Sequence, residues 1–391
     1  MKSLFFALLF LPFLFVDPAV AGPIDMGARG VSNFIARLEK ERKAHVAFLG
    51  GSITQNATGH SKMVADWLVK EYPDVEFTFT NAGLSSTCSV SGAFRVEEDV
   101  FSKGQVDLLV VEFAVNDNQD AMHDRQTAIR GLEGILRQYF EENPTGDAIS
   151  LQYVNPEILK NHQEGKPTVS VEAHKAVAEH YNIPIVDVGM ALATEISAGR
   201  MTWEEDYKGT HPNQKGYEFA SGLITKVIKK TISGETPQLV TLPDPLDEKS
   251  YYGAKRVDPR ALNWLGGWEF APVSKELLPV GQIRADYTRF QALRSESEGE
   301  YLYYTFQGNM IGAFVLAGPD AGAIEVSIDA GEWKRVELYH HFSKSLNYPR
   351  SVILADGLSN AYHQIAIRTA KSENEESKGS SATILYFAAN Q

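Results

Sequence analysis

The sequence predicts a two-domain protein in which an α/β domain precedes an all-β domain. From Val46 to about Lys230, short apolar runs alternate with stretches whose apolar residues recur at spacings of three and four. That alternation is typical of a parallel sheet covered by helices on both faces, a three-layer α/β/α fold. After Gly234 the chain changes to short alternating segments bounded by turn residues, which indicate a small β-sandwich. The length of 391 residues also favours two hydrophobic cores over one.

Five apolar runs are expected to form the strands of the α/β domain: HVAFLG, VEFTFTNAG, VDLLVVEFAVND, AISLQYV and IPIVDVG. Helical patterns lie between them, as in HSKMVADWLVKEY, TAIRGLEGILRQYF and SVEAHKAVAEHYN. The second domain is expected to contain the strands YLYYTFQGN, IGAFVLAGPDAG, AIEVSIDAGEW, KRVELYH, HQIAIRT and ATILYFA. The polar segment SENEESKGSS is expected to form a loop between the last two of them.

The domain boundaries follow from composition. Residues 1–21 contain a lysine near the start, an apolar run of about 13 residues and the ending Ala-Val-Ala, which predicts a secretory signal peptide. A membrane anchor is the alternative, but the run is shorter than the roughly 20 apolar residues that a spanning helix needs. We expect a secreted or periplasmic protein with an α/β domain over 22–235, a proline-containing linker over 236–250 and a β-sandwich accessory domain over 251–391.

Charge and cysteine content limit the partners. Lys and Arg total 37 against 50 for Asp and Glu, so the formal net charge is −13. This charge argues against nucleic acid or anionic lipid as a partner, and we expect no membrane insertion after removal of the signal peptide. Cys88 is the single cysteine, which excludes an intrachain disulfide, and we expect it to be a small buried thiol.

The segment VAFLGGSITQN suggests chemistry at the end of a strand. Its apolar run ends in Gly50-Gly51-Ser52. A serine at the first turn of the helix that follows such a strand is placed to attack a carbonyl, and its own N–H can bind the oxyanion that forms. The alternative is a tight turn in which Ser52 only caps a helix.

Three further residues favour a catalytic Ser52. A hydroxyl needs a base to become a nucleophile, and THPNQKGY supplies His211 on a loop before a helix. Gly83 offers an unshielded backbone N–H and Asn116 a side-chain amide, both after strands that should end at the same edge of the sheet. The four residues together predict one acyl-transfer site with an oxyanion hole.

At this point the chain resembles the SGNH hydrolases of the GDSL esterase superfamily. The resemblance rests on the blocks FLGGSITQ, NAGLSST, VVEFAVND and THPNQKGY, in this order, and spans roughly residues 44 to 230. It implies a flavodoxin-like SGNH domain in which Ser52 is the nucleophile and His211 the general base. The implied oxyanion hole comprises the Ser52 N–H, the Gly83 N–H and the Asn116 side chain. Asp117 is similar to the structural aspartate of the family, which orients nearby loops.

One departure concerns the acid that orients the histidine. The family usually has this acid three residues before the histidine, but Lys208 stands there. Asp206 is the tentative substitute, because Gly209 could let the loop fold so that the carboxylate reaches the ring. Otherwise a backbone carbonyl orients His211 and the site is a Ser-His dyad. Glu112, in an apolar strand, is expected to act only indirectly or to be a satisfied buried acid.

No other group of residues has the spacing of a metal site, so we expect no metal and no cofactor. His174 and His180 lie six residues apart on a predicted helix and are expected at the surface. His340 and His341 are adjacent in a predicted strand, so their side chains should point to opposite faces. Arg95 could shape the substrate pocket or pair with a carboxylate.

The resemblance leaves several ester substrates open, and the expected reaction is removal of O-acetyl groups from a polysaccharide or oligosaccharide. Secretion and a β-sandwich similar to accessory domains of polysaccharide-deacetylating enzymes favour an acetylated carbohydrate. A secreted lysophospholipase or thioesterase, or a non-catalytic carbohydrate-binding protein, are the alternatives. Trp264, Trp268 and Trp333 could stack on sugar rings or could belong to the core of the second domain.

Overall fold

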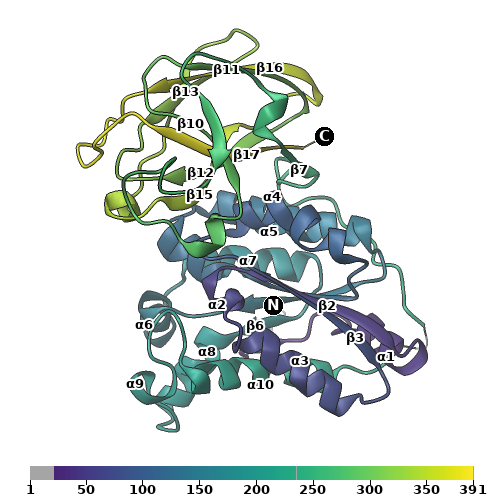
Figure 1. The fold of residues 1–391 in the computed structure, drawn as a ribbon. Helices are drawn as coiled ribbons and strands as arrows, with labels where there is room; N and C mark the ends of the chain where they lie inside the picture. The colour runs from purple at the N-terminus through teal and green to yellow at the C-terminus, as the bar shows by residue number, and fades with distance from the viewer. Residues whose placement is uncertain (1–21, 235, 391) are drawn as a thin grey trace, which may run out of the picture.

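The computed structural model describes residues 22–234 and 236–390, so the predicted signal peptide lies outside the described residues (Figure 1). The N-terminal region contains one six-stranded sheet in the order β1-β6-β5-β4-β2-β3. The run β3-β2-β4-β5-β6 is parallel, and β1 pairs antiparallel with β6. This is the flavodoxin-like order expected of the domain. The strands are β1 (Ile24–Asp25), β2 (Lys43–Gly50), β3 (Glu76–Gly83), β4 (Leu108–Glu112), β5 (Asp147–Gln152) and β6 (Ile185–Asp187).

Helices cover both faces of this sheet, as the spacing of apolar residues predicts. One face packs against α4 (Ser89–Asp99), α5 (Arg125–Glu142) and α7 (Val169–His180). The other face packs against α1 (Ser32–Lys40), α3 (His60–Glu71), α8 (Val188–Ser197) and α10 (Gln214–Lys230). The shorter helices are α2 (Ser52–Gln55), α6 (Pro156–Glu164) and α9 (Trp203–Asp206), and residues Asn116–Asp120 form a π-helical turn. The predicted three-layer α/β/α fold is confirmed.

The C-terminal region consists of two antiparallel sheets that enclose a core of their own. One sheet has the order β15-β12-β17-β10-β9, with β7 also paired to β17, and the other has the order β14-β13-β16-β11-β8. The predicted all-β region is confirmed, with residues 371–381 joining β16 to β17 as expected. The strands are β7 (Ala254–Val257), β8 (Asn263–Leu265), β9 (Glu269–Pro272), β10 (Gln291–Ser295), β11 (Tyr301–Gly308), β12 (Ile311–Ala317), β13 (Ala323–Ile328), β14 (Lys334–Glu337), β15 (Tyr348–Ala355), β16 (Ala361–Ala370) and β17 (Ala382–Asn390).

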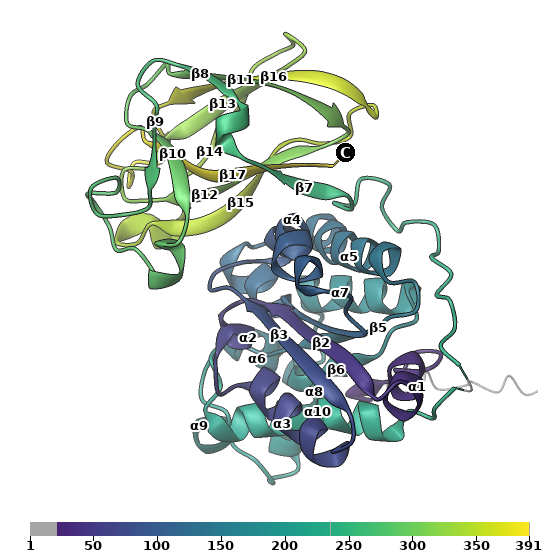
Figure 2. The same cartoon turned by 45° about the vertical axis from the view of Figure 1, so that its right-hand side comes forward.

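The β region sits on the face of the α/β region formed by α4 and α5 (Figure 2). One hydrophobic cluster is continuous across the boundary and includes Phe94 of α4 and Phe314 of β12. Polar contacts add to it: the hydroxyls of Ser91 and Ser351 lie 2.8 Å apart, and the Tyr287 hydroxyl donates to the carbonyl oxygen of Ser85 at 2.7 Å. Because apolar packing and hydrogen bonds both cross the boundary, the two regions form one joined unit.

The proline-containing connector between the two regions is pinned to α5. The buried carboxylate of Glu133 accepts hydrogen bonds from the backbone N–H groups of Leu246 and Asp247 at 2.6 and 3.0 Å. The side chain of Asp247 in turn forms an ion pair with Arg130 at 2.8 Å. These contacts hold the connector along the helix although it contains no strand or helix of its own.

The tryptophans of the β region have different environments. Trp268 is buried in the sandwich core, which excludes it from stacking on a sugar. Trp333 is 39% exposed, and the Arg368 guanidinium lies over its ring at 4.4 Å. The side chain of Trp264 lies outside the described part of the chain.

Candidate active site

Two glycines bring the end of β2 close to its neighbours. A Cβ on Gly51 would collide with the amide of Asn116, and a Cβ on Gly50 would collide with the Thr54 side chain and the Glu112 carbonyl oxygen. Only glycine therefore allows the strand to end against β4 and pass directly into α2, which begins at Ser52. The Gly-Gly pair is explained by this close approach.

Ser52 and His211 are in hydrogen-bond contact. The Ser52 Oγ and the His211 Nε2 lie 2.7 Å apart, although the residues are 159 positions apart in the chain. His211 lies on the exposed loop before α10, as the sequence predicts. Both residues line a pocket of about 410 Å³ at the carboxyl edge of the sheet. A hydroxyl that contacts a ring nitrogen in this way can lose its proton to the ring.

Asn116 lines the same pocket and is 3% exposed. It follows β4 at the start of the π-helical turn, and its side-chain Nδ2 donates to Asp120 Oδ2 at 2.7 Å. An amide nitrogen carries two hydrogens, so one N–H remains for a ligand in the pocket. The structure thus brings Ser52, Asn116 and His211 together, as the sequence predicts.

Gly83 does not reach this pocket, which corrects the expectation for the oxyanion hole. It is the last residue of β3, paired with Gly50, and its N–H donates to Asn81 Oδ1 at 2.9 Å. The loop approaches the pocket three residues later, at Ser86, which has a φ of 63°. No acceptor for the Ser86 N–H is found in the part of the chain that the structure describes. A serine in the left-handed region gives no sequence signal, so the pattern pointed to the nearby glycine instead.

The structure also does not bring Asp206 to His211. The Asp206 carboxylate accepts hydrogen bonds from the Thr202 N–H at 2.8 Å and from Lys215 Nζ at 2.9 Å. Between Asp206 and His211 the chain turns at Lys208 and Gly209, which have φ angles of 68° and 97°. This turn keeps the carboxylate on α9 and α10. Among the described residues, His211 has one side-chain partner, Ser52.

Asp117 forms a buried polar centre beside the pocket. Its carboxylate accepts from the Ser89 N–H at 2.8 Å, the Ser89 hydroxyl at 2.6 Å and His174 Nε2 at 2.8 Å. Burial alone would raise the pKa of Asp117, but the charge of His123 and the hydrogen bonds from both histidines hold it well below its usual range. His174 is therefore buried and hydrogen-bonded, and its expected surface position is wrong. A helical spacing alone does not show which face of α7 meets the core.

One group of side chains around Asp117 has the spacing that a metal ion could use. Ligand atoms of Cys88, Asp117 and His123 all lie within 4.8 Å of one another, and Cys88 is buried as expected. Asp117 raises the pKa of His123 to about 10 against the effect of burial, so the ring is a cation at neutral pH. The Asp117 oxygens already accept several protein donors, and His123 Nδ1 lies 3.4 Å from Asp117 Oδ1 as an ion pair. The expectation of no metal stays a prediction.

Glu112 lies behind the pocket and is completely buried. Its Oε2 accepts from the Thr54 hydroxyl at 3.0 Å, which ties the end of β4 to α2. Burial raises the pKa of Glu112 to about 8 in spite of that hydrogen bond.

Arg95 is likewise buried: it donates to the carbonyl oxygens of Ala82 and Gly50 and pairs with Asp99 at 2.9 Å. Glu112 and Arg95 both support the strand ends that position Ser52.

The outer wall of the pocket comes from the β region. Its residues are Gln282, Arg284, Phe342, Ser345, Leu346 and Tyr348. His340 and His341 lie nearby at the start of a 3₁₀ turn, with ring centroids 4.1 Å apart. Their expected placement on opposite faces of a strand is therefore wrong, because this segment is a turn. No sequence motif marks these residues, which follow Ser52 by more than 200 positions.

The parallel sheet places the Ser52–His211 contact at its carboxyl edge, where ligands bind in proteins of the α/β class. The family model described as the GDSL-like lipase/acylhydrolase family matches residues 48–219. Over this stretch the chain is similar to that family, and the protein is a serine ester hydrolase. The resemblance inferred from the four sequence blocks is confirmed.

Two solved structures resemble this chain over almost its whole length. Both are described as a two-domain esterase (CEX) active on acetylated mannans, and one was co-crystallized with mannopentaose. The structure with mannopentaose has a TM-score of 0.71 and 20% identity, and the match covers 92% of this chain and 94% of that one. The other has a TM-score of 0.72 and 21% identity, and the match covers 93% of this chain and 96% of that one. Such a likeness shows that the two-domain fold is shared. No curated protein matches the sequence.

Proposed function

We propose that the protein is a secreted esterase that removes O-acetyl groups from an acetylated polysaccharide or oligosaccharide, with Ser52 as nucleophile and His211 as general base. The observation that supports this most directly is the 2.7 Å contact between Ser52 Oγ and His211 Nε2 inside an open pocket. Nε2 can accept the hydroxyl proton when the ring carries its own proton on Nδ1.

The reaction proceeds in two steps. Ser52 Oγ bonds to the acetyl carbonyl carbon while His211 takes its proton, and the tetrahedral intermediate collapses as His211 returns that proton to the departing sugar oxygen. A water molecule, deprotonated by His211, then attacks the acetyl-serine, and acetate leaves as Ser52 regains its proton. With Asp206 paired elsewhere, the site works as a Ser-His dyad.

The oxyanion hole in this proposal consists of the Ser52 N–H, the Asn116 Nδ2 and the Ser86 N–H. Ser86 replaces Gly83, because Ser86 lines the pocket and its N–H has no acceptor among the residues described, whereas the Gly83 N–H is bonded to Asn81. Donors of this kind stabilise the negative charge that develops on the carbonyl oxygen in the transition state. The Tyr287 hydroxyl of the β region holds the adjacent Ser85 carbonyl and so supports the loop.

A carbohydrate substrate is supported by two considerations. The two solved structures that share the two-domain fold are esterases active on acetylated mannans. The pocket wall offers Gln119, Gln282 and Arg284, which can bind sugar hydroxyls, and the net charge of −13 suits a neutral polymer. We further propose that the region after about residue 250 is an accessory domain that holds the sugar part of the substrate at the pocket.

Export is proposed from residues 1–21, whose composition is that of a signal peptide. Within the described residues, the helices are too short or too polar to cross a membrane.

The test is acetate release from acetylated mannan and acetylated xylan, alongside short-chain and long-chain aryl esters. We expect the mature protein to release acetate and Ser52→Ala to lose activity by several orders of magnitude. Ser102→Ala is the matched control, since Ser102 caps the end of α4 far from the pocket and should leave the rate unchanged. Preference for long acyl chains would favour a lipase or thioesterase. No release of acetate from any ester by the folded wild type would overturn the proposal.

A further inference from the structure

Asp120 connects the groups of the pocket to one another. It ends the π-helical turn that begins at Asn116, and its side chain is buried at the pocket edge. Each carboxylate oxygen accepts one side-chain hydrogen bond: Oδ2 from Asn116 Nδ2 at 2.7 Å and Oδ1 from Gln119 Nε2 at 3.1 Å. The single carboxylate therefore fixes two amides at once.

Gln119 extends this connection to the loop that carries His211. Its Oε1 accepts from the hydroxyl of Thr210 at 3.2 Å and from Asn155 Nδ2 at 3.3 Å. Thr210 directly precedes His211 in the chain. A continuous path of hydrogen bonds thus runs from the Asn116 amide through Asp120 and Gln119 to the residue beside His211.

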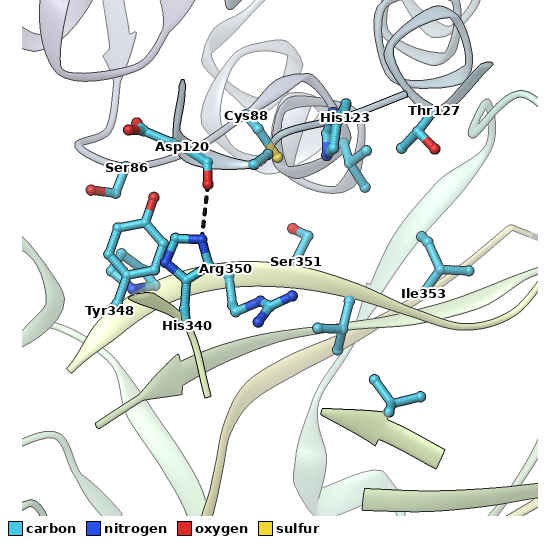
Figure 3. Close-up of a pocket in the computed structure, with 15 residues that line it drawn as sticks. Ser86, Cys88, Asp120, His123, Thr127, His340, Tyr348, Arg350, Ser351 and Ile353 are labelled. Atoms are coloured by element: carbon cyan, nitrogen blue, oxygen red, sulfur yellow. Dashed lines mark hydrogen bonds between the residues drawn. The ribbon is translucent and has the colours of Figure 1, made fainter. Parts of the chain in front are cut away.

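The β region holds Asp120 from the opposite side. His340 Nε2 donates to the carbonyl oxygen of Asp120 at 2.9 Å (Figure 3). His340 Nδ1 accepts from the Phe342 N–H at 3.3 Å, so the two contacts together define a neutral ring with its proton on Nε2. Burial, which lowers the pKa of His340 to about 4, agrees with this neutral form. Tyr348 stacks on the ring with centroids 4.4 Å apart. Backbone and side chain of Asp120 are therefore both fixed.

We propose that Asp120 is the positioning residue of this site: it orients the Asn116 amide toward the oxyanion and, through Gln119 and Thr210, holds the loop of His211. Asp120 takes over the task of fixing the base loop that Asp206, engaged by Thr202 and Lys215, does not perform. The proposal rests on the proposed function, since it assigns a support role to groups that the proposed function makes catalytic.

The chemistry of the carboxylate explains why an acid stands here. A carboxylate offers two acceptor oxygens, so it can bind the N–H groups of Asn116 and Gln119 together. An asparagine of the same size has one acceptor oxygen, and its NH₂ group would face a second N–H donor. Asp120→Asn therefore breaks one branch of the network without removing volume. Gln119→Ala breaks only the branch toward Thr210.

The experiment measures kcat and KM for 4-nitrophenyl acetate and the rate at which a fluorophosphonate labels Ser52, forming an Oγ–P bond with loss of fluoride. We expect Asp120→Asn to lower kcat by about 10-fold to 10²-fold with KM changed less than about threefold, because misplacing catalytic groups by about 1 Å has effects of this size. The labelling rate should fall in parallel, and Gln119→Ala should lower kcat by a smaller factor. Asp124→Asn is the matched control, because Asp124 only caps α5 and Asn keeps that hydrogen bond.

The outcomes separate the two proposals. If the wild type neither hydrolyses the ester nor reacts with the fluorophosphonate, the proposed function fails and the role of Asp120 fails with it. If the wild type is active and Asp120→Asn keeps its kcat, only the role of Asp120 is overturned. If Asp120→Asn does not fold, Gln119→Ala decides: an unchanged kcat in that variant contradicts the path to the His211 loop.

Discussion

The inner and outer walls of the pocket differ in the kind of contact that holds their residues. The inner wall, from the α/β region, consists of Ser52, Asn116 and Asp120, which follow strands of the parallel sheet and are tied by side-chain hydrogen bonds. The outer wall comes from two parts of the β region, the loop before β10 and the segment that leads from β14 into β15. It includes Phe342, which is 40% exposed. The difference shows that hydrogen bonds fix the groups proposed to react, whereas aromatic packing among His340, Phe342 and Tyr348 holds much of the opposite wall.

Asn116→Ala tests the inner wall with the largest expected effect. We expect kcat to fall by roughly 10² to 10³ because one oxyanion donor is lost. KM should change little, since the bond strengthens mainly in the transition state. Steady-state kinetics on a small acetate ester would show this split, with circular dichroism as the control for folding. An unchanged kcat would remove Asn116 from the hole and weaken the contrast between the walls.

Glu112→Gln tests the buried carboxyl group behind the inner wall, and the quantity measured is the free energy of unfolding. Burial raises the pKa of Glu112 from 4.5 to about 8, so the folded state holds the proton more tightly than the unfolded chain. The tighter proton binding by Glu112 stabilises the folded state fully below pH 4.5, and this stabilisation is lost as the pH rises to about 8. Glutamine is neutral throughout, so the stability of Glu112→Gln relative to the wild type should increase by a few kcal/mol between pH 4 and pH 8.

Urea unfolding at pH 4, 6 and 8 measures this difference, with Glu205→Gln as an exposed control that should follow the wild type. If wild type and Glu112→Gln show the same dependence on pH, Glu112 is ionised in the folded protein and the inner wall rests on a buried charge.

Phe342→Ala tests the outer wall. Loss of an aromatic surface that lines the pocket should raise KM for an acetylated oligosaccharide by about 10-fold, which corresponds to about 1.4 kcal/mol of binding free energy. Hydrolysis of 4-nitrophenyl acetate, which is too small to need that wall, should stay within about twofold. Equal losses on both substrates would mean that the outer wall also positions the reacting groups.

Asp206→Asn has the smallest expected effect, because Asp206 lies outside both walls and binds Thr202 and Lys215. Its kcat should match that of Glu205→Gln within about twofold on either substrate. A much larger loss for Asp206→Asn would indicate that the loop rearranges during the reaction and brings this carboxylate to His211.

Elements with a local signal could be predicted from the sequence, and contacts set by loop conformation could not. The strand end at Gly50 follows from its apolar run, and Ser52, Asn116 and His211 lie in recognisable blocks. The run VDLLVVEFAVND predicts a longer strand than the structure has, because β4 ends at Glu112. The sequence did not indicate that Ser86 lies at the pocket in place of Gly83, because the φ of 63° at Ser86 is a property of the folded loop. The outer wall could not be foreseen, since its position depends on how the sheet that contains β7 and β15 packs on α4.

Asp120 illustrates the same limit within one motif. The letters NDNQD are visible in the sequence, but a π-helical turn is what directs Asn116 and Asp120 toward each other. The run VDLLVVEFAVND predicts a strand that continues to Asp117, so the pattern of residues did not indicate this turn.

The pocket draws its two walls from opposite ends of the chain, and this has a consequence for biosynthesis. A ribosome makes the chain from the N-terminus, so the whole parallel sheet, with Ser52 and His211, is available for folding well before Tyr348 has been translated. During that interval the nascent α/β region already contains its reactive pair but lacks the His340 contact to Asp120 and the Tyr287 contact to Ser85. Activity on an acetylated oligosaccharide is therefore expected to appear late in synthesis, when the last third of the chain docks.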